Sequence, residues 1–319
     1  MAYEDFLKEW NGTSPFVKVK TSGSTGKPKE MLVEKSRMLA SARMTCDTLN
    51  LHEGDTALLC MSTDYIAGKM MVVRSIERGL KLTVIKPSNH PFATLREPFD
   101  FVAMIPSQVY ETLRVPEEAS VLARCKNIII GGGAISPELA NAINEISADN
   151  SERVFLSTYG MTETLSHIAL RQLNGSEASE WYTPMKGVSV SLADDGCLVI
   201  DAPHLCAEPL KTNDIAEIID GRFRIRGRKD NVICSGGIKI QIEEVEQMLQ
   251  PHLHSPFAVT KKADKKFGEI VVLLTESNDI ESIKVICEDI LPRYWRPKEI
   301  IHIAQIPMTE TGKIKRSRE

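Results

Sequence analysis

Small hydroxyl residues, glycines and lysines are concentrated in residues 21–29, which read TSGSTGKPK. Such a stretch has little apolar surface to bury and a low propensity for helix or strand. Its backbone N–H groups, hydroxyls and ammonium groups could surround an anion such as a phosphate. A disordered linker would have a similar composition, and the residues alone leave these two interpretations equally open. The candidate phosphate-binding residues are Thr21, Ser22, Gly23, Ser24, Thr25, Gly26 and Lys27.

A second group of candidate residues lies in the segment STYGMTET, residues 157–164. Tyr159 offers a flat apolar face for a purine base, and Thr162 offers a hydroxyl. Glu163 is a carboxylate that could hold Mg²⁺, because this ion usually takes one or two carboxylates together with substrate phosphates. An ordinary turn with a core tyrosine and an exposed glutamate explains the same residues. For this segment by itself, the turn is the simpler interpretation.

Three further segments could contribute to a nucleotide site. Asp214 and Arg228 could bind ribose hydroxyls, or they could form a plain surface ion pair. The turn at residues 234–239, CSGGIK, could approach a ligand closely or could simply close a hairpin. Lys313, in the segment PMTETGKIKR, could act on a substrate or could belong to a frayed basic tail.

The elements that would position these residues alternate between strands and helices in the first half of the chain. Apolar runs at residues 56–61, 101–105 and 127–130 predict buried strands. Pro106 and Pro137 suit the first turn of the helices that follow two of these runs. The alternation predicts an α/β fold whose large N-terminal part has a mostly parallel sheet covered by helices.

The pattern changes in the second half of the chain. After about residue 180, short apolar runs separated by Asp-Gly turns predict a short β-meander. Further on, helices predicted over residues 241–250 and 281–291 alternate with strands in a small α+β unit. We therefore predict a large domain over residues 1–229 and a small, mobile C-terminal domain over residues 230–319.

Composition limits the classes of function that are compatible with the chain. With 319 residues it can bury a sizeable core, and its net charge of −4 does not favour binding to nucleic acid or to an anionic membrane. The seven cysteines form no C-x-x-C pair, and no apolar run approaches the roughly 18 residues of a membrane span. We expect a cytoplasmic protein with no nucleic-acid partner and no membrane insertion.

The motifs occur once each and in order, and together they resemble the acyl-adenylate-forming superfamily. This superfamily includes acyl-CoA synthetases, luciferase-like enzymes and nonribosomal adenylation domains. The matching motifs are TSGSTGKPK, YGMTET, TNDIAE, GRKDNVICSGG and TGKIKR, so the resemblance covers nearly all of the chain from residue 21. Within the superfamily, the stretches IIIGGGAIS and GMTETLSHIALR are most similar to the 2-succinylbenzoate–CoA ligases of menaquinone synthesis.

The resemblance implies an ATP-dependent acid–CoA ligase that works in two steps. A carboxylate attacks the α-phosphorus of ATP to give acyl-AMP and pyrophosphate, and the thiol of coenzyme A then attacks the acyl carbon and releases AMP. Neither step needs a covalent enzyme intermediate, so the residues would act by positioning and charge stabilisation. The implied catalytic residues are Lys27, Thr162, Glu163 and Lys313, with Mg²⁺ held by Glu163.

The resemblance also implies where the nucleotide and the thiol bind. Besides residues 21–27 and Lys313, the implied ATP-binding residues are Gly131, Gly132, Gly133, Ala134, Tyr159, Gly160, Thr162, Asp214 and Arg228. The turn of Ser235, Gly236 and Gly237 is implied to approach coenzyme A. Asp230 is implied to be a hinge about which the C-terminal domain turns between the two steps.

The acyl pocket is the part that the motifs define least. Tyr65 lies near the position where the family carries a histidine, and His167 follows the Glu163 motif, so both are candidate acyl-substrate residues. A second carboxylate on the acid would need a cation or a polar cluster, for which Lys69, Arg74 and Arg171 are further candidates. An ordinary solvent-facing charge is the favoured interpretation for these three, and for His167 the two interpretations are even.

Several functions stay open at this point. The leading prediction is ligation of 2-succinylbenzoate, with another aryl- or acyl-CoA ligase or a carrier-loading adenylating enzyme as the alternative. A non-catalytic nucleotide-binding protein is less favoured, because Lys27, Glu163 and Lys313 are all present. Only about twenty residues precede Thr21, so we expect a missing or minimal N-terminal subdomain. The expected partners are a small carboxylic acid, ATP and coenzyme A, with a homodimer left open.

Overall fold

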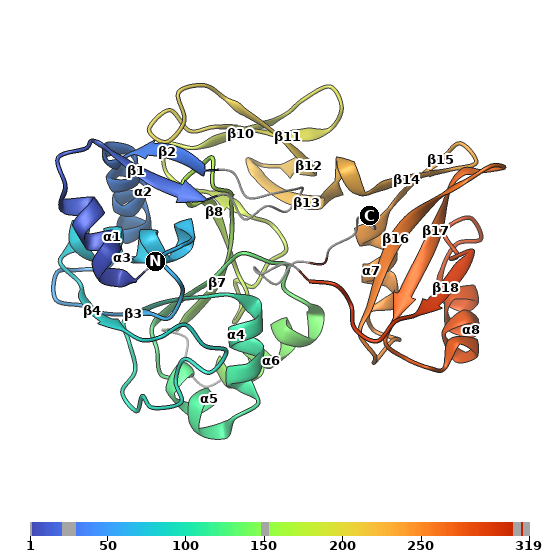
Figure 1. Cartoon of the computed structure of the whole chain (residues 1–319), viewed down its shortest axis with the longest axis horizontal. Helices are drawn as coiled ribbons and strands as arrows, with labels where there is room; N and C mark the ends of the chain where they lie inside the picture. The colour runs from blue at the N-terminus through green and yellow to red at the C-terminus, as the bar shows by residue number, and fades with distance from the viewer. Residues whose placement is uncertain (1, 21–29, 148–152, 309–313, 315–319) are drawn as a thin grey trace. The chain divides into compact units, whose positions relative to one another are not determined.

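The computed structural model describes residues 2–20, 30–147, 153–308 and 314 of the chain (Figure 1). The chain groups into two compact units. The first comprises Met1–Val190, Ile200–Leu210 and Asp220–Arg222, and the second comprises Ser191–Val199, Lys211–Ile219 and Phe223–Glu319. The functional boundary between residues 229 and 230 stays a prediction.

A seven-stranded sheet forms the centre of the first unit. Its strands run in the order β4-β3-β5-β6-β7-β8-β9. Neighbours from β4 to β7 are parallel, whereas β8 and β9 are antiparallel to the strands beside them. The strands are β3 (Thr56–Leu59), β4 (Lys81–Val84), β5 (Phe101–Met104), β6 (Asn127–Ile130), β7 (Val154–Gly160), β8 (His167–Gln172) and β9 (Thr183–Pro184). The predicted mostly parallel α/β sheet is confirmed.

Each face of this sheet carries its own apolar core. Ala57 and Leu59 of β3 point into a core shared with α2 (Lys35–Thr48) and α3 (Ile66–Arg78). Leu58 and Cys60 point to the opposite face, because successive side chains of a strand alternate. That second core includes α4 (Pro106–Leu113), α5 (Pro116–Leu122) and α6 (Pro137–Ser147) (Figure 1). The central strands are therefore buried on both faces.

Local sequence signals fix the starts of these helices. Proline occupies the first helical position of α4, α5 and α6, where its missing N–H group leaves no hydrogen bond unmade. The Ser136 hydroxyl accepts a hydrogen bond from the Leu139 N–H at 3.2 Å and so caps α6. These starts place the loops that precede α4 and α6 at the carboxyl ends of β5 and β6.

The first residues of the chain add a helix and a hairpin to the first core. Helix α1 (Tyr3–Asn11) buries Phe6 and Trp10 there. Strands β1 (Phe16–Lys20) and β2 (Glu30–Glu34) pair antiparallel, and Lys20 pairs with Glu30. Strand β2 therefore lies between residues 21–29 and helix α2 in the chain.

The remaining strands form two further sheets. The predicted meander is confirmed as a four-stranded sheet in chain order, comprising β10 (Ser189–Leu192), β11 (Cys197–Asp201), β12 (Leu210–Ile219) and β13 (Arg222–Arg228). A 3₁₀ turn, η1 (Lys229–Asn231), follows β13.

The last part of the chain is the predicted α+β arrangement. A five-stranded sheet has the order β15-β14-β17-β16, with β18 parallel to β17. Its strands are β14 (Val232–Ser235), β15 (Ile238–Gln241), β16 (Phe257–Asp264), β17 (Gly268–Thr275) and β18 (Glu299–His302). Helices α7 (Ile242–Leu249) and α8 (Ile280–Ile290) cover one face, with Val245, Leu273 and Ile283 in the shared core.

Candidate active site

Several residues of the predicted site lie outside the described part of the chain. They are Thr21, Ser22, Gly23, Ser24, Thr25, Gly26, Lys27 and Lys313. Their roles stay predictions. The described site residues of the first unit lie at the carboxyl ends of β6 and β7 and in the loop after β7, and those of the second unit lie between β12 and α7.

The glycine stretch after β6 leaves its backbone accessible. Gly132, Gly133 and Ala134 are exposed, and Gly132 has a φ of +85°, a conformation that favours glycine. A Cβ on Gly131 would lie 2.4 Å from the Thr158 hydroxyl oxygen, so a side chain there would collide with β7. Backbone groups at the carboxyl end of a parallel strand are where ligands of α/β sheets usually bind.

Tyr159 and Gly160 lie at the adjacent end of β7. The Tyr159 ring is half-buried, and its centroid lies 5.8 Å from that of Tyr182 with the planes inclined at 56°. The Tyr182 hydroxyl lies 2.9 Å from the hydroxyl of Ser157. Pairing with β8 shifts register between Tyr159 and Gly160, and a Cβ on Gly160 would lie 2.3 Å from the Ser166 carbonyl oxygen. Glycine is therefore needed for the chain to bend here.

The loop after Gly160 is held by hydrogen bonds to Thr164. The Thr164 hydroxyl accepts from the Met161 N–H at 3.0 Å and donates to the Ser166 carbonyl oxygen at 2.7 Å. Leu165 is buried with a φ of +65°, which turns the chain sharply back into β8. As a result Thr162 is buried, while the Glu163 side chain is exposed and accessible to a ligand.

His167 and Arg74 meet beneath this loop. The His167 Nε2 lies 3.2 Å from the Thr45 hydroxyl, its Nδ1 lies 3.3 Å from the Ser166 hydroxyl, and the Arg74 guanidinium donates to that same hydroxyl. Burial, with a further contribution from the positive charge of Arg74, holds the pKa of His167 well below its ordinary value. His167 is therefore a neutral, polar group at pH 7 and not a cation.

Arg74 is a buried cation without a counter-ion among the described residues. Its side chain is 2% exposed, and its Nε has no hydrogen-bond partner in the part of the chain that the structure describes. Burial lowers the pKa of the guanidinium to about 10, which still leaves it charged at pH 7. The solvent-facing interpretation favoured for Arg74 is wrong. Ser166, which holds this guanidinium beside the loop, was not singled out in the sequence, because a serine within a motif carries no distinguishing signal.

Lys69 and Tyr65 lie near the start of α3. Lys69 is 1% exposed, and its Nζ lies 3.5 Å from a carboxylate oxygen of Glu9 and 4.7 Å from the centroid of the Phe6 ring. Burial lowers the pKa of Lys69, and Glu9 partly opposes that shift. The solvent-facing interpretation is wrong for Lys69 too. Tyr65 is half-buried just before the first residue of α3, and its backbone bridges to that of Lys20.

Arg171 lies on β8, beside the ring of Tyr182. Its guanidinium carbon lies 5.4 Å from the Tyr182 ring centroid, and it donates to the Ser179 carbonyl oxygen at 3.2 Å. Its Nε is buried and has no hydrogen-bond partner among the described residues. Arg171 is thus a half-buried group next to the aromatic pair, and the solvent-facing interpretation does not describe it.

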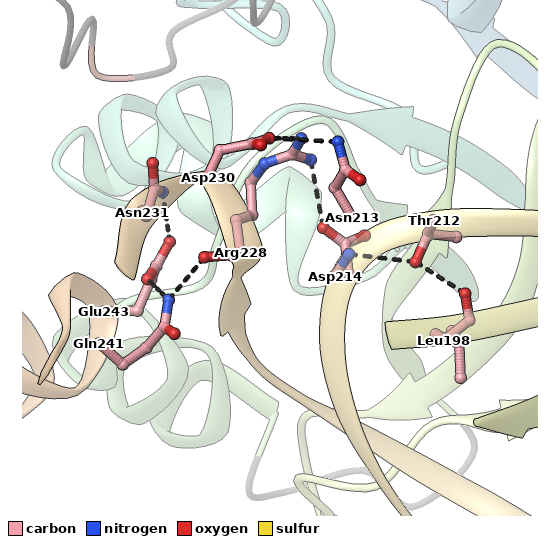
Figure 2. Close-up of polar contacts among 9 residues, drawn as sticks. All are labelled: Leu198, Thr212, Asn213, Asp214, Arg228, Asp230, Asn231, Gln241 and Glu243. Atoms are coloured by element: carbon pink, nitrogen blue, oxygen red, sulfur yellow. Dashed lines mark hydrogen bonds and ion pairs between the residues drawn. The ribbon is translucent and has the colours of Figure 1, made fainter. Parts of the chain in front are cut away.

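The predicted ribose pair does come together. Arg228 donates to Asp214 at 3.2 Å and, with its other terminal nitrogen, to Asp230 at 2.9 Å (Figure 2). Thr212 orients the Asp214 backbone, since its hydroxyl accepts from the Asp214 N–H at 3.1 Å. Burial alone would lower the pKa of Arg228, but the Asp230 hydrogen bond and the charge of Asp214 outweigh it and raise the pKa. The pair is more organised than a chance surface contact.

The predicted hinge, Asp230, and the glycine turn predicted to approach coenzyme A come after Arg228 in the chain. Asp230 is exposed in η1 and also accepts from the Asn213 side-chain amide at 3.3 Å (Figure 2). Ser235 ends β14, and Gly236 and Gly237 form the turn to β15, with φ of +57° and +84° at the two glycines. No atom lies within 4 Å of a Cβ built on Gly237, so that glycine is required by its conformation and leaves open space beside it.

Comparison with known proteins places the chain in a family. Residues 8–204, more than half of the chain, match the family model described as AMP-binding enzyme. The chain is 36% identical to the crystallised acyl-CoA synthetase (AMP-forming)/AMP-acid ligase II-like protein from Dyadobacter fermentans, with 97% of this chain and 90% of that chain covered and a TM-score of 0.66. The chain therefore belongs to the AMP-binding enzyme family.

More distant relatives define the class of reaction. The chain is 25% identical to a 2-succinylbenzoate–CoA ligase from Listeria monocytogenes, over 98% of this chain and 71% of the relative, and 27% identical to one from Escherichia coli, over 97% and 69%. The fold is shared with O-succinylbenzoate coenzyme A synthetase from Bacillus subtilis, crystallised with ATP and a magnesium ion, at 20% identity and a TM-score of 0.76, with 94% and 68% covered. The protein is an AMP-forming acid–CoA ligase.

The carboxylates among the described residues indicate how a magnesium ion could bind. Within residues 2–20, 30–147, 153–308 and 314, no three His, Cys, Asp or Glu side chains gather as they would around a resident metal ion. A magnesium ion that arrives on the phosphates of a nucleotide needs only one or two carboxylates, and the exposed Glu163 fits that requirement.

None of the described helices has the length and apolar character needed to cross a bilayer.

Proposed function

We propose that the protein adenylates 2-succinylbenzoate with ATP, releases pyrophosphate, and transfers the acyl group to coenzyme A with release of AMP. The observation that carries the choice of acid is the buried guanidinium of Arg74. A buried charge without a counter-ion costs several kcal/mol, and that cost is recovered when an anion arrives. 2-Succinylbenzoate has a second carboxylate, which is not adenylated and can serve as this anion.

The relatives support the same acid. The curated relatives at 25% and 27% identity are 2-succinylbenzoate–CoA ligases, and the alignment covers about 70% of their length. His167 is neutral in its buried position, so in this proposal it is a polar neighbour of the acid, and the charge comes from Arg74. Ser166 touches both residues and fixes the guanidinium beside the Thr162 loop.

The nucleotide would lie over the ends of β6 and β7. Tyr159 would stack on adenine, with the exposed backbone of Gly132, Gly133 and Ala134 along the edge of the base. Thr162 would touch the α-phosphate. Asp214 and Arg228 would bind the ribose hydroxyls, for which the carboxylate is an acceptor and the guanidinium a donor.

The charge that develops on the phosphates would be met by donors from two parts of the chain. Residues 21–27 would surround the β- and γ-phosphates, and Lys313 would bridge the α-phosphate and the attacking carboxylate. One such donor is typically worth about 2.7–4 kcal/mol, or roughly a hundred- to thousand-fold in rate. Magnesium held by Glu163 would neutralise phosphate charge. Asp230 would be the hinge that withdraws Lys313 and brings Ser235, Gly236 and Gly237 to the thioester.

An acid-dependent ATP–pyrophosphate exchange assay tests the proposal. The panel should contain 2-succinylbenzoate, benzoate, a medium-chain fatty acid and an amino acid. Exchange that is fastest with 2-succinylbenzoate supports the proposed acid. Faster exchange with another acid would reassign the substrate, and thioester formation only on a carrier protein would reassign the acceptor. Nucleotide binding without exchange for any acid would indicate a non-catalytic protein.

A further inference from the structure

Gln241, the last residue of β15, and Glu243, in the first turn of α7, contact the chain on both sides of Asp230 (Figure 2). Building on the proposed two-step function, in which Asp230 is the hinge, we infer that Gln241 and Glu243 form a latch. The latch holds the hinge in one of its settings and must open when the residues after Asp230 turn. Gln241 and Glu243 are thus positioning residues, because they act on the hinge and not on a substrate.

The contact that crosses the hinge comes from Gln241. Its side-chain Nε2 donates to the carbonyl oxygen of Arg228 at 2.9 Å, so a residue eleven positions after Asp230 holds the backbone two positions before it. Gln241 is 9% exposed, which limits the access of water as a replacement partner. A rotation of the backbone at Asp230 would separate these two atoms.

Glu243 completes the latch from the other side. One of its carboxylate oxygens accepts a hydrogen bond from the Gln241 Nε2. This bond uses one N–H of the Gln241 amide, and the other N–H points toward the Arg228 carbonyl oxygen. The other oxygen accepts from the side-chain amide of Asn231, the residue directly after the hinge. Because Asn231 and Glu243 both follow Asp230, their contact can persist while the Gln241 contact breaks.

Close packing at Gly227 supports the same geometry. A Cβ on Gly227 would lie 2.3 Å from the Gln241 Nε2 and 2.6 Å from a Glu243 carboxylate oxygen. Only glycine lets these two side chains reach the end of β13. Arg228, whose carbonyl oxygen the latch holds, uses its guanidinium to bridge Asp214 and Asp230, so the latch acts directly beside the proposed ribose ligands.

A proteolysis experiment tests the latch without any substrate. Gln241→Met keeps the length of the side chain and removes its hydrogen bonds, and Gln247→Met makes the same change at an exposed position of α7. Loss of a hydrogen bond worth about 1 kcal/mol should raise the rate of tryptic cleavage after Arg228 and Lys229 about fivefold in Gln241→Met. Gln247→Met should be cleaved like the wild type. Equal rates in all three proteins, or an equal acceleration at every cleavage site of Gln241→Met, would overturn the latch.

Separate assays of the two half-reactions provide a second test of the latch. ATP–pyrophosphate exchange and thioester formation from supplied acyl-AMP are measured separately, and their ratio is compared. Gln241→Met should change the ratio about fivefold, since a latch favours the setting in which one of the two steps occurs. An unchanged ratio would contradict the latch even if both rates fell together. If the wild type shows no exchange with any acid, the proposed function fails, whereas the cleavage result is independent of it.

Discussion

The Arg74 guanidinium donates to the Ser166 hydroxyl, which joins helix α3 to the loop that carries Thr162 and Glu163. Among the described residues no carboxylate pairs with Arg74, and its Nε has no hydrogen-bond partner there. The fold therefore keeps a cation buried beside its candidate site, and nothing in the described residues neutralises it. Natural proteins rarely bury an arginine unless a partner is provided, and here the substrate is the proposed partner.

Replacement of Arg74 by methionine should lower the activity toward 2-succinylbenzoate without lowering the stability of the fold. Because the buried charge is uncompensated without substrate, Arg74→Met should leave the melting temperature unchanged or raise it. The kcat/KM for 2-succinylbenzoate should fall by roughly 10- to 150-fold, the value of a charged hydrogen bond of about 1.5–3 kcal/mol. A fall in melting temperature together with an equal loss for every acid would show that Arg74 is only structural.

Stability should depend on pH through His167. The pKa of His167 is lowered in the folded chain, so below about pH 6.5 the unfolded chain binds a proton that the folded chain does not. Stability should therefore fall as the pH drops from 7 toward 5, by at most about 1.4 kcal/mol per pH unit for this group. Urea unfolding at several pH values measures the effect.

The matched variants make the pH test specific. His167→Gln should be less stable than the wild type at pH 7.5, and the difference should shrink as the pH falls. His252→Gln changes an exposed histidine in the same way and should follow the wild type at every pH. A difference between His167→Gln and the wild type that stays constant from pH 7.5 to 5 would show that His167 is not held neutral.

Replacement of Glu163 by glutamine should raise the magnesium requirement. The Glu163 side chain is exposed, so Glu163→Gln should not change the melting temperature. The magnesium concentration for half-maximal exchange should rise about tenfold, since loss of an anionic ligand weakens the site. Glu177→Gln, another exposed position, is the control. An unchanged magnesium dependence in Glu163→Gln would show that this carboxylate does not bind the metal.

A methyl group on Gly160 should disturb the bend at the end of β7. Its Cβ would lie 2.3 Å and 2.5 Å from backbone atoms of Ser166 and His167, which cannot move as a flexible side chain could. Gly160→Ala should lower the free energy of unfolding by about 1–3 kcal/mol. Gly133→Ala, whose Cβ would lie 3.4 Å from Pro106, is the control for stability and should change it much less. Equal stability of the two variants would contradict the close packing.

The sequence predicts the fold well where local rules are strong. The apolar runs that became β3, β5 and β6, and the prolines at positions 106 and 137, carry their structural meaning within a few residues. The burial of Lys69 and Arg74 could not be predicted in this way. Both are charged and would ordinarily face solvent, and the groups that they contact, Glu9 and Ser166, are distant in sequence. Contacts of this kind depend on the tertiary fold.

Pairing of Arg74 with the second carboxylate of the acid can be measured by ATP–pyrophosphate exchange with 2-succinylbenzoate and with analogues that keep only one of its two carboxylates. We expect rapid exchange with the diacid, exchange at least about tenfold slower with every monoacid, and loss of this preference in Arg74→Met. Equal exchange with the diacid and a monoacid, or a preference that survives in Arg74→Met, would show that Arg74 does not bind the second carboxylate.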